Sequence, residues 1–359
     1  MSDVRVLIVR HGEHRGRKLS RYMGRSLTYL RRQRPDVYQH LVFHHTGKPP
    51  PALDGIGAVV FWLWCPLRER HPACYEEAVR VADEARKNSI LLINPPWALS
   101  DLGKSRQARL WRETGIPTPE VERFETLESL KKAAGRLVFP LVLRGDLTHF
   151  QKAMRIVRDP DELLALRTGD LLFPCAASPF IDVRSGYRDT QPKSAYARLF
   201  HKKRLIVANG VIRTKHVMFS TSPIVGAKTS IFRKTESFGG LETPFLLWPL
   251  HRECVEHDLS YWRQEEEHRD LMLKACRALG LQFAAIDYSS LSDGTPILWE
   301  ANADFGIPRL KSIMLPHRRR AAERLVSYHE AIGKFLSELL TALSASPAKA
   351  VPSLSITAG

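Results

Sequence analysis

The stretch that decides the fold is FAAIDYSSLSDGTPILWEANADFG, Phe283–Gly306. Two apolar runs flank Ser292–Thr295, and this Ser-Asp-Gly-Thr sequence is a typical hairpin turn. If the two central turn residues form the loop, the two outer ones pair, and Asp287 falls directly opposite Glu300. Asn302 points to the same face as Glu300, because side chains alternate along a strand.

This predicted hairpin would bring two carboxylates together on one face of a sheet. Directly opposed like charges repel each other, and a divalent cation relieves that repulsion. Asp287, Glu300 and Asn302 offer only hard oxygen ligands, which suit Mg²⁺ held partly by protein and partly by phosphates. The alternative is a solvent-facing strand pair whose charges point to water.

Strand and helix patterns alternate in the first part of the chain. Apolar runs at Val4–Val9, Ala58–Leu63 and Ser89–Asn94 predict buried strands. The basic stretches between and after them, including Tyr75–Asn88, are compatible with helices. This alternation predicts a small open α/β domain over roughly residues 1–98.

Later segments add further strands and helices. Asn209-Gly210, within VANGVI, is a strong hairpin signal. Glu265–Leu279 predicts a helix that Gly280 closes. A last amphipathic helix carries one apolar face, formed by Leu325, Tyr328, Ile332, Phe335 and Leu339. The Ser-, Pro- and Ala-rich tail after Ala345 predicts disorder.

The order of these motifs resembles the ATP-grasp superfamily. A helix ending in Ala-Leu-Gly-Leu, a strand ending at Asp287, a turn, and Glu300-Ala301-Asn302 followed by Gly-Ile-Pro are similar to the signature of glutathione synthetases and the ribosomal-protein glutamate ligase. Earlier blocks with the same likeness are Asn94, Lys104, Gly115–Pro119, Pro140–Arg144 and Ser178–Asp182. The resemblance spans about residues 94–308.

The resemblance implies a fold of mixed α/β and α+β class. An N-terminal Rossmann-like (pre-ATP-grasp) domain at 1–98 would hold substrate. A two-lobed ATP-grasp domain would follow, with its small lobe at 99–178 and its large lobe, carrying the metal site, at 179–345. Residues 346–359 would form the disordered tail.

The resemblance also implies roles for individual residues. Asp287, Glu300 and Asn302 would hold Mg²⁺ at the phosphates of ATP. The residues expected to contact ATP are Lys104, Arg144, Lys152, Phe180, Ile181 and Asp182. The catalytic candidates, which would stabilise the transferring phosphoryl group, are Arg198, Lys215 and His216.

Two departures from the family pattern stand near Arg144. The family usually has lysine there, and arginine keeps the charge but changes its geometry. The loop that follows, Gly145–Met154, reads GDLTHFQKAM and has one glycine, where the family uses several. His149 and Lys152 are the side chains expected to replace the backbone amides at the phosphates. The alternative that the nucleotide site is degenerate therefore stays open.

The first strand ends in Arg10-His11-Gly12-Glu13, which is similar to the start of a histidine phosphatase. That chemistry needs a second histidine at a strand end, and no later His-Gly dipeptide occurs. Arg10 and His11 are therefore candidate substrate contacts, and the alternative is that they are turn residues of the loop after this strand. The loop after the first strand lies at the carboxyl edge of the sheet, where ligands bind in open α/β folds.

The resemblance implies an ATP-dependent carboxylate–amine ligase that works through an acyl phosphate and releases ADP and phosphate. A formal net charge of +16 favours an acidic small-molecule or peptide substrate, beside an amine acceptor. The alternatives are an ATP-grasp kinase of a small molecule, a degenerate module that binds nucleotide or nucleic acid, and a histidine phosphatase.

Composition narrows the partners and the location. No apolar run is long enough for a membrane span and no signal-peptide pattern opens the chain, so the sequence predicts a cytoplasmic protein without a membrane partner. The basic runs come without an RNA-binding or zinc-finger pattern, so nucleic acid is not favoured as a partner. The resemblance allows a homodimer.

Overall fold

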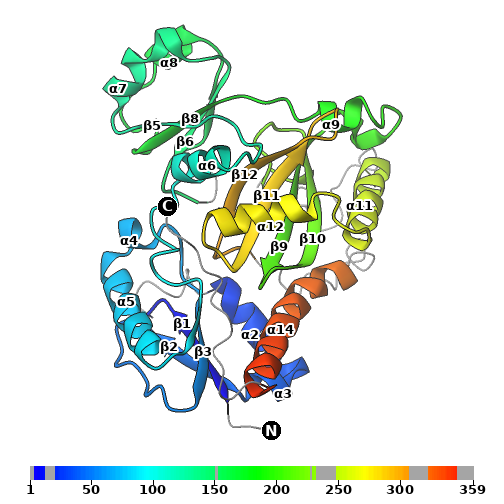
Figure 1. The fold of residues 1–359 in the computed structure, drawn as a ribbon. Helices are drawn as coiled ribbons and strands as arrows, with labels where there is room; N and C mark the ends of the chain where they lie inside the picture. The colour runs from blue at the N-terminus through cyan, green and yellow to red at the C-terminus, as the bar shows by residue number, and fades with distance from the viewer. Residues whose placement is uncertain are drawn as a thin grey trace.

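The computed structural model describes residues 4–12, 21–149, 153–226, 229–231, 248–306 and 322–345. Three four-stranded sheets, each with its own helices, organise these residues (Figure 1). The prediction of a mixed α/β fold is thus confirmed. The predicted disordered tail and Lys152 lie outside the described residues. None of the helices in the described ranges combines the length and apolar character needed to cross a bilayer.

The N-terminal sheet has four parallel strands in the order β2-β1-β3-β4. Their bounds are β1 Arg5–Arg10, β2 Leu41–His45, β3 Ile56–Phe61 and β4 Leu91–Ile93. β1 is buried from Val6 to Val9 because α2 (Arg21–Gln33) covers one face of the sheet and α5 (Pro72–Lys87) covers the other. From the sequence, the stretches between the predicted strands are interpreted as compatible with helices. That interpretation is wrong for β2, whose short apolar run stands within a largely basic stretch.

The C-terminal sheet is antiparallel, in the order β10-β9-β11-β12. Its strands are β9 Phe200–Ala208, β10 Val211–Ser220, β11 Phe283–Ser290 and β12 Pro296–Asn302. Asn209 and Gly210 join β9 to β10 with φ angles of 50° and 72°. Positive φ at both positions is what a two-residue hairpin loop requires, so the predicted hairpin is confirmed.

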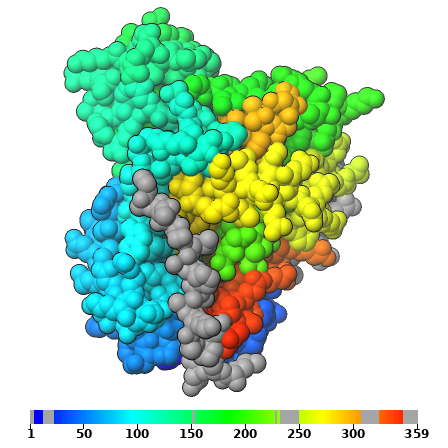
Figure 2. Space-filling model, viewed as in Figure 1, coloured from blue at the N-terminus to red at the C-terminus, as the bar shows by residue number. Residues whose placement is uncertain are grey.

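The third sheet is smaller and has the order β5-β8-β6-β7. Its strands are β5 Glu122–Phe124, β6 Leu141–Gly145, β7 Arg155–Val157 and β8 Cys175–Pro179. With α7 (Leu127–Lys132) and α8 (Pro160–Leu164) it forms a separate apolar core. This unit, teal in the figures, projects from the rest of the molecule (Figure 2).

Further helices connect the sheets. They are α3 (Pro35–Tyr38), α4 (Leu67–Arg70), α6 (Lys104–Glu113), α9 (Ser185–Arg188), α11 (Trp248–Arg263), α12 (Arg269–Ala278) and α14 (Ala322–Ala345). The predicted apolar face of α14 is buried, and it packs against both the N-terminal sheet and β11 in one core. The N-terminal and C-terminal sheets therefore share their apolar cores.

Asn94 connects these two sheets through hydrogen bonds. Its backbone N–H donates to the side chain of Gln282 at 2.8 Å, and its Nδ2 donates to the carbonyl of Phe283 at 2.6 Å. Its Oδ1 accepts from the backbone N–H groups of both residues. Since Phe283 begins β11, this fully buried side chain fixes the start of the strand that carries Asp287.

We expect Asn94→Ala to lower the free energy of unfolding by about 1–3 kcal/mol, because buried backbone groups lose their partners. Urea unfolding measures the change. Asn88→Ala is the control, since Asn88 is exposed and bonds only within its own helix turn. Its effect should stay within about 0.5 kcal/mol. Equal effects of the two substitutions would contradict this role of Asn94.

Candidate functional site

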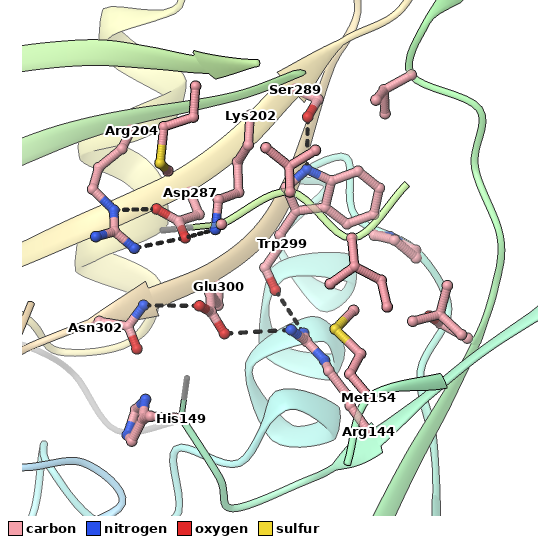
Figure 3. Close-up of a pocket in the computed structure, with 18 of the residues that line it drawn as sticks. Arg144, His149, Met154, Lys202, Arg204, Asp287, Ser289, Trp299, Glu300 and Asn302 are labelled. Carbon is pink, nitrogen blue, oxygen red and sulfur yellow. Dashed lines mark hydrogen bonds and ion pairs between the residues drawn. The ribbon is translucent and has the colours of Figure 1, made fainter. Parts of the chain in front are cut away.

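A cavity of about 370 Å³ lies between the small sheet and the C-terminal sheet. One part of its wall is apolar and includes Val142, Met154, Phe180, Ile181, Met218 and Trp299. The other part is charged or polar and includes Arg144, Lys202, Arg204, Asp287, Glu300 and Asn302. In Figure 3 the charged and polar side chains of β9, β11 and β12 gather on one side, Trp299 and Met154 lie on the other, and Arg144 extends from beside Met154 toward Glu300.

The β11–β12 hairpin places Asp287 opposite Glu300, which confirms the pairing predicted from the sequence. The loop and the strand pairing that produce this register differ from those predicted. The ladder stops at Ser290 opposite Pro296, so the loop is longer than two residues. A bulge leaves Trp299 unpaired and restores the register at Glu300. The bulge also lets Trp299 and Glu300 both face the cavity.

Asp287 is fully buried and its carboxylate is saturated by two cations from β9. Lys202 Nζ donates to Oδ2 at 2.7 Å, and Arg204 donates to both oxygens, with Nη2 2.8 Å from Oδ2. Burial by itself would raise the pKa of Asp287. The Arg204 guanidinium and the Lys202 ammonium outweigh burial and lower this pKa, so the carboxylate is held ionised.

Glu300 has a second set of partners. Its Oε2 lies 3.4 Å from Arg144 Nη1 and 3.9 Å from Lys104 Nζ, and its Oε1 accepts from Asn302 Nδ2 at 3.2 Å. Burial opposes ionisation, but the charges of Lys104 and Arg144 hold the pKa of Glu300 well below its usual range. Glu300 is 17% exposed, and it is therefore more open to the cavity than Asp287.

Lys104 stands on α6 and Arg144 on β6, and Asp146 connects these two elements by hydrogen bonds. Asp146 follows β6 and accepts from the backbone N–H and the hydroxyl of Ser105 at the start of α6. A carboxylate in this position satisfies an otherwise unpaired N–H of the first helical turn. The backbone N–H of Lys104 also donates to the carbonyl of Asp146. Burial lowers the pKa of Lys104, and Glu300 partly offsets that effect.

The apolar part of the cavity is also ordered by hydrogen bonds. Trp299 Nε1 donates to Ser289 Oγ at 2.9 Å, and its carbonyl accepts from Arg144 Nη2 at 3.2 Å. The indole is thereby fixed beside Arg144. A flat apolar slot next to a cluster of cations and carboxylates suits a ligand with an aromatic ring at one end and anionic groups at the other.

Comparison with known proteins supplies the fold. No protein-family model matches this chain, and no curated protein matches it either. Among solved structures, D-alanine--D-alanine ligase from Bacillus anthracis is similar with a TM-score of 0.53 and 13% identity, over 96% of this chain and 99% of that one. The macrocyclase MdnC from Microcystis aeruginosa MRC, bound with precursor peptide MdnA, gives 0.52 and 14%, over 93% and 100%. The ATP-grasp ligase PsnB, complexed with a minimal precursor, gives 0.51 and 12%, over 90% and 99%.

This chain has the ATP-grasp fold. The resemblance found in the sequence is confirmed at that level, because these matches cover nearly the whole of each chain. At 12–14% identity they carry no information about substrate.

Within this ATP-grasp fold, the predicted ATP contacts lie in different positions. Arg144, Phe180 and Ile181 line the cavity. Lys104 is 2% exposed and reaches the cavity only through Glu300. The carboxylate of Asp182 binds the guanidinium of Arg184 and is not among the described lining residues.

The predicted catalytic residues are not brought to the cavity. Lys215 lies on the opposite face of the sheet, where its Nζ donates to Glu266 at 3.2 Å and to the carbonyl of Glu265. His216 is level with Arg204 in the ladder, but its ring is bonded to Tyr328 of α14. Arg198 is exposed in the short 3₁₀ turn before β9.

A bulge in β10 explains the position of Lys215. A regular ladder from the Asn209-Gly210 turn would pair Lys215 with Arg204 and put both on the cavity face. The register shifts between Ile212 and Thr214, so His216 pairs with Arg204 and Lys215 turns away.

Lys202 and Arg204 are the main residues that the sequence reasoning missed. They stand in HKKRLIV, at alternate positions of a strand. Alternation with period two places both on one face, and that signal could have identified them. Thr148, Trp64 and Asp304 also line the cavity. His149, which was already named from the sequence, lines it too.

The predicted substrate contacts Arg10 and His11 do not line the cavity within the described residues. His11 is 5% exposed, and its Nε2 accepts from the backbone N–H of Trp64 at 3.0 Å. Its Nδ1 lies 3.4 Å from Cys74 Sγ. A phosphatase histidine must present a free ring nitrogen to its substrate, and His11 has both nitrogens engaged in the interior.

His11 should make folding sensitive to acid. Burial, with the nearby His71 and Arg70, lowers the pKa of His11 to about 3. Below pH 6.5 the unfolded chain protonates this histidine and the folded chain does not, so stability is lost as pH falls from 6.5 towards 3. We expect His11→Asn to flatten the dependence of unfolding free energy on pH by up to about 1.4 kcal/mol per pH unit in that window. Urea unfolding at pH 7.5, 6.0 and 5.0 measures this, and parallel curves for the two proteins would contradict it.

Proposed function

We propose that the chain is an ATP-dependent carboxylate–amine ligase. The observation that carries this proposal is a cavity in which an apolar slot adjoins Asp287, Glu300 and Asn302 and the cations paired with the two carboxylates. Adenine fits the apolar slot, and the triphosphate fits the cationic part. Neutralisation of the phosphates and their positioning are the main requirements of phosphoryl transfer.

The donor set fits Mg²⁺ held jointly with phosphates. Two carboxylates and an amide oxygen are hard ligands, and Mg²⁺ commonly takes only one or two protein carboxylates at such sites. Within the described residues, no three His, Cys, Asp or Glu side chains gather so as to hold a metal ion by themselves. This agrees with a metal that phosphates help to bind. When bound, Mg²⁺ would offset charge on the phosphate oxygens.

The protein's own cations have assigned tasks in this proposal. Lys202 and Arg204 pair with Asp287 while no phosphate is present. With nucleotide bound, they and Arg144 would turn to the phosphate oxygens and stabilise charge as the γ-phosphoryl group moves. The substrate carboxylate takes that group, ADP leaves, and an amine then displaces phosphate from the acyl phosphate to form the amide.

We propose the domain roles accordingly. Residues 1–98 form a Rossmann-like substrate domain, 99–178 form the small lobe, and 179–345 form the large lobe with the metal ligands. The cytoplasm, where ATP is made available to such ligases, is the proposed location.

ADP release tests the reaction type. The assay contains the full chain, ATP, Mg²⁺ and L-glutamate as an acidic probe, with or without hydroxylamine, which converts an acyl phosphate into a hydroxamate. A ligase gives ADP release that needs both probes and equals the hydroxamate formed. ADP release with glutamate alone favours a kinase. Nucleotide binding without turnover for a panel of carboxylic acids favours the degenerate module that the glycine-poor loop left open.

A further inference from the structure

The cations near the cavity differ in whether a carboxylate pairs with them. Glu300 pairs with Lys104 and Arg144, and Asp287 pairs with Lys202 and Arg204. Arg10 lies close enough to Asp304 to lower the pKa of that carboxyl, although burial, the larger effect, raises it.

Arg70 has no such partner. It ends α4, and no carboxylate of the described residues lies within ion-pair distance of its guanidinium. Its Nη1 is buried without a hydrogen-bond partner. Burial lowers the pKa of Arg70, yet arginine stays charged under all ordinary conditions. A buried, unpaired guanidinium donor is costly, so a site that retains one is suited to an anionic ligand.

Arg70 does not line the cavity itself, but it packs against a residue that does. Its guanidinium carbon is 5.4 Å from the centre of the Trp64 ring, and Trp64 lines the cavity. His149, another lining residue, packs edge-on against Trp64 with ring centres 5.5 Å apart. Burial, followed by the charge of Lys104 and a smaller effect of Arg70, lowers the pKa of His149 to about 3. His11 and His149, two histidines near Arg70, are therefore neutral at pH 7 and add no further positive charge beside its guanidinium.

This end of the cavity adjoins the phosphate end. Asn302 and Asp304 both line the wall, and they stand two residues apart on the chain. Trp64 and His149 complete the wall on the side of the N-terminal sheet. A substrate whose reacting carboxylate sits near Glu300 and Asn302 would thus extend towards Trp64 and Arg70.

We propose that Arg70 binds a second carboxylate of the acyl donor, so that the substrate class is a dicarboxylic acid or an acidic amino acid. The inference rests on the proposed ligase function and deepens it. The planar guanidinium offers paired N–H donors that match a carboxylate, and the face of Trp64 keeps it in place. Arg70 would therefore be a specificity-determining residue that leaves nucleotide binding untouched.

Calorimetric titration with glutarate and butyrate tests this, since the two acids differ chiefly in the second carboxylate. The wild type, saturated with a non-hydrolysable Mg-ATP analogue, should bind glutarate at least tenfold more tightly than butyrate. Arg70→Met should abolish that preference, and Arg70→Lys should retain part of it. Arg68→Met is the matched control, because Arg68 is exposed on the same short helix and pairs with Glu69.

The outcomes separate the inference from the proposed function. Absence of analogue binding to the wild type would overturn the function itself. Analogue binding with no preference for glutarate, or with a preference that Arg70→Met leaves intact, would overturn the inference alone. Analogue affinity and the thermal midpoint of Arg70→Met report whether that variant is folded. If it is not, a preference for glutarate that is weaker in Arg70→Lys than in Arg68→Met supports the inference, and an equal preference in the two variants overturns it.

Discussion

Glu300→Gln should reduce ADP formation by about 10²–10³-fold, the usual cost of removing one preorganised electrostatic contact in an active site. Glutamine keeps the size of the side chain but removes the charge that faces Lys104 and Arg144. It also weakens the hard-oxygen set proposed for Mg²⁺. The assay measures initial rates with ATP, Mg²⁺, L-glutamate and hydroxylamine.

A matched control separates this effect from a general change of charge. Glu128 is exposed at the start of α7, so Glu128→Gln should leave the rate unchanged. Circular dichroism and the thermal midpoint report whether Glu300→Gln is folded. A folded variant that keeps more than about a tenth of the wild-type rate would show that Glu300 does not serve the reaction as proposed.

Asp287→Ala should destabilise the ligand-free protein by about 3–5 kcal/mol, because it leaves two cations in the interior without their partner. Asp287 is fully buried, and the side chains of Lys202 and Arg204 are each 16% exposed. Urea unfolding at pH 7.5 measures the loss. The pH dependence follows from the lowered pKa of Asp287 in the folded protein. The stabilisation that Asp287 contributes is fully present above the carboxyl pKa of the unfolded chain, and it is lost as the pH falls through the carboxyl pKa of the folded chain.

Two further variants sharpen this test. Adding Lys202→Met to Asp287→Ala should recover part of the loss, since one of the uncompensated charges is removed. Asp189→Ala removes an exposed carboxylate that pairs with Arg188, and it should change stability by less than about 0.5 kcal/mol. If Asp287→Ala behaves like Asp189→Ala, the ion pairs of Asp287 with Lys202 and Arg204 contribute nothing to folding.

Local rules predicted the two hairpins of the C-terminal sheet. Asn209-Gly210 adopts the positive φ angles that its residue types favour, and Asp287 pairs with Glu300 as the turn sequence suggested. The second agreement depends on two departures that no local rule supplies, a longer loop and the bulge at Trp299. Pairing across a sheet constrains the register more strongly than the turn does.

The catalytic candidates show where reasoning from the sequence reached its limit. Lys215 faces away from the cavity because of a one-residue bulge near Arg213, and a bulge reflects the fit of the whole sheet rather than a local preference. His216 keeps the cavity-side face but is bonded to Tyr328, which is distant in sequence. Arg70 could not be singled out, because its missing partner is a property of the folded chain.

Thermal unfolding with and without a non-hydrolysable Mg-ATP analogue tests the central claim most directly. At a hundred times its dissociation constant the analogue should stabilise the wild type by roughly 2.7 kcal/mol, a rise of several degrees in the midpoint. We predict this shift for the wild type and a much smaller one for Glu300→Gln at the same concentration. No shift of the wild type at millimolar analogue would contradict the assignment of the cavity between the two sheets as a nucleotide site.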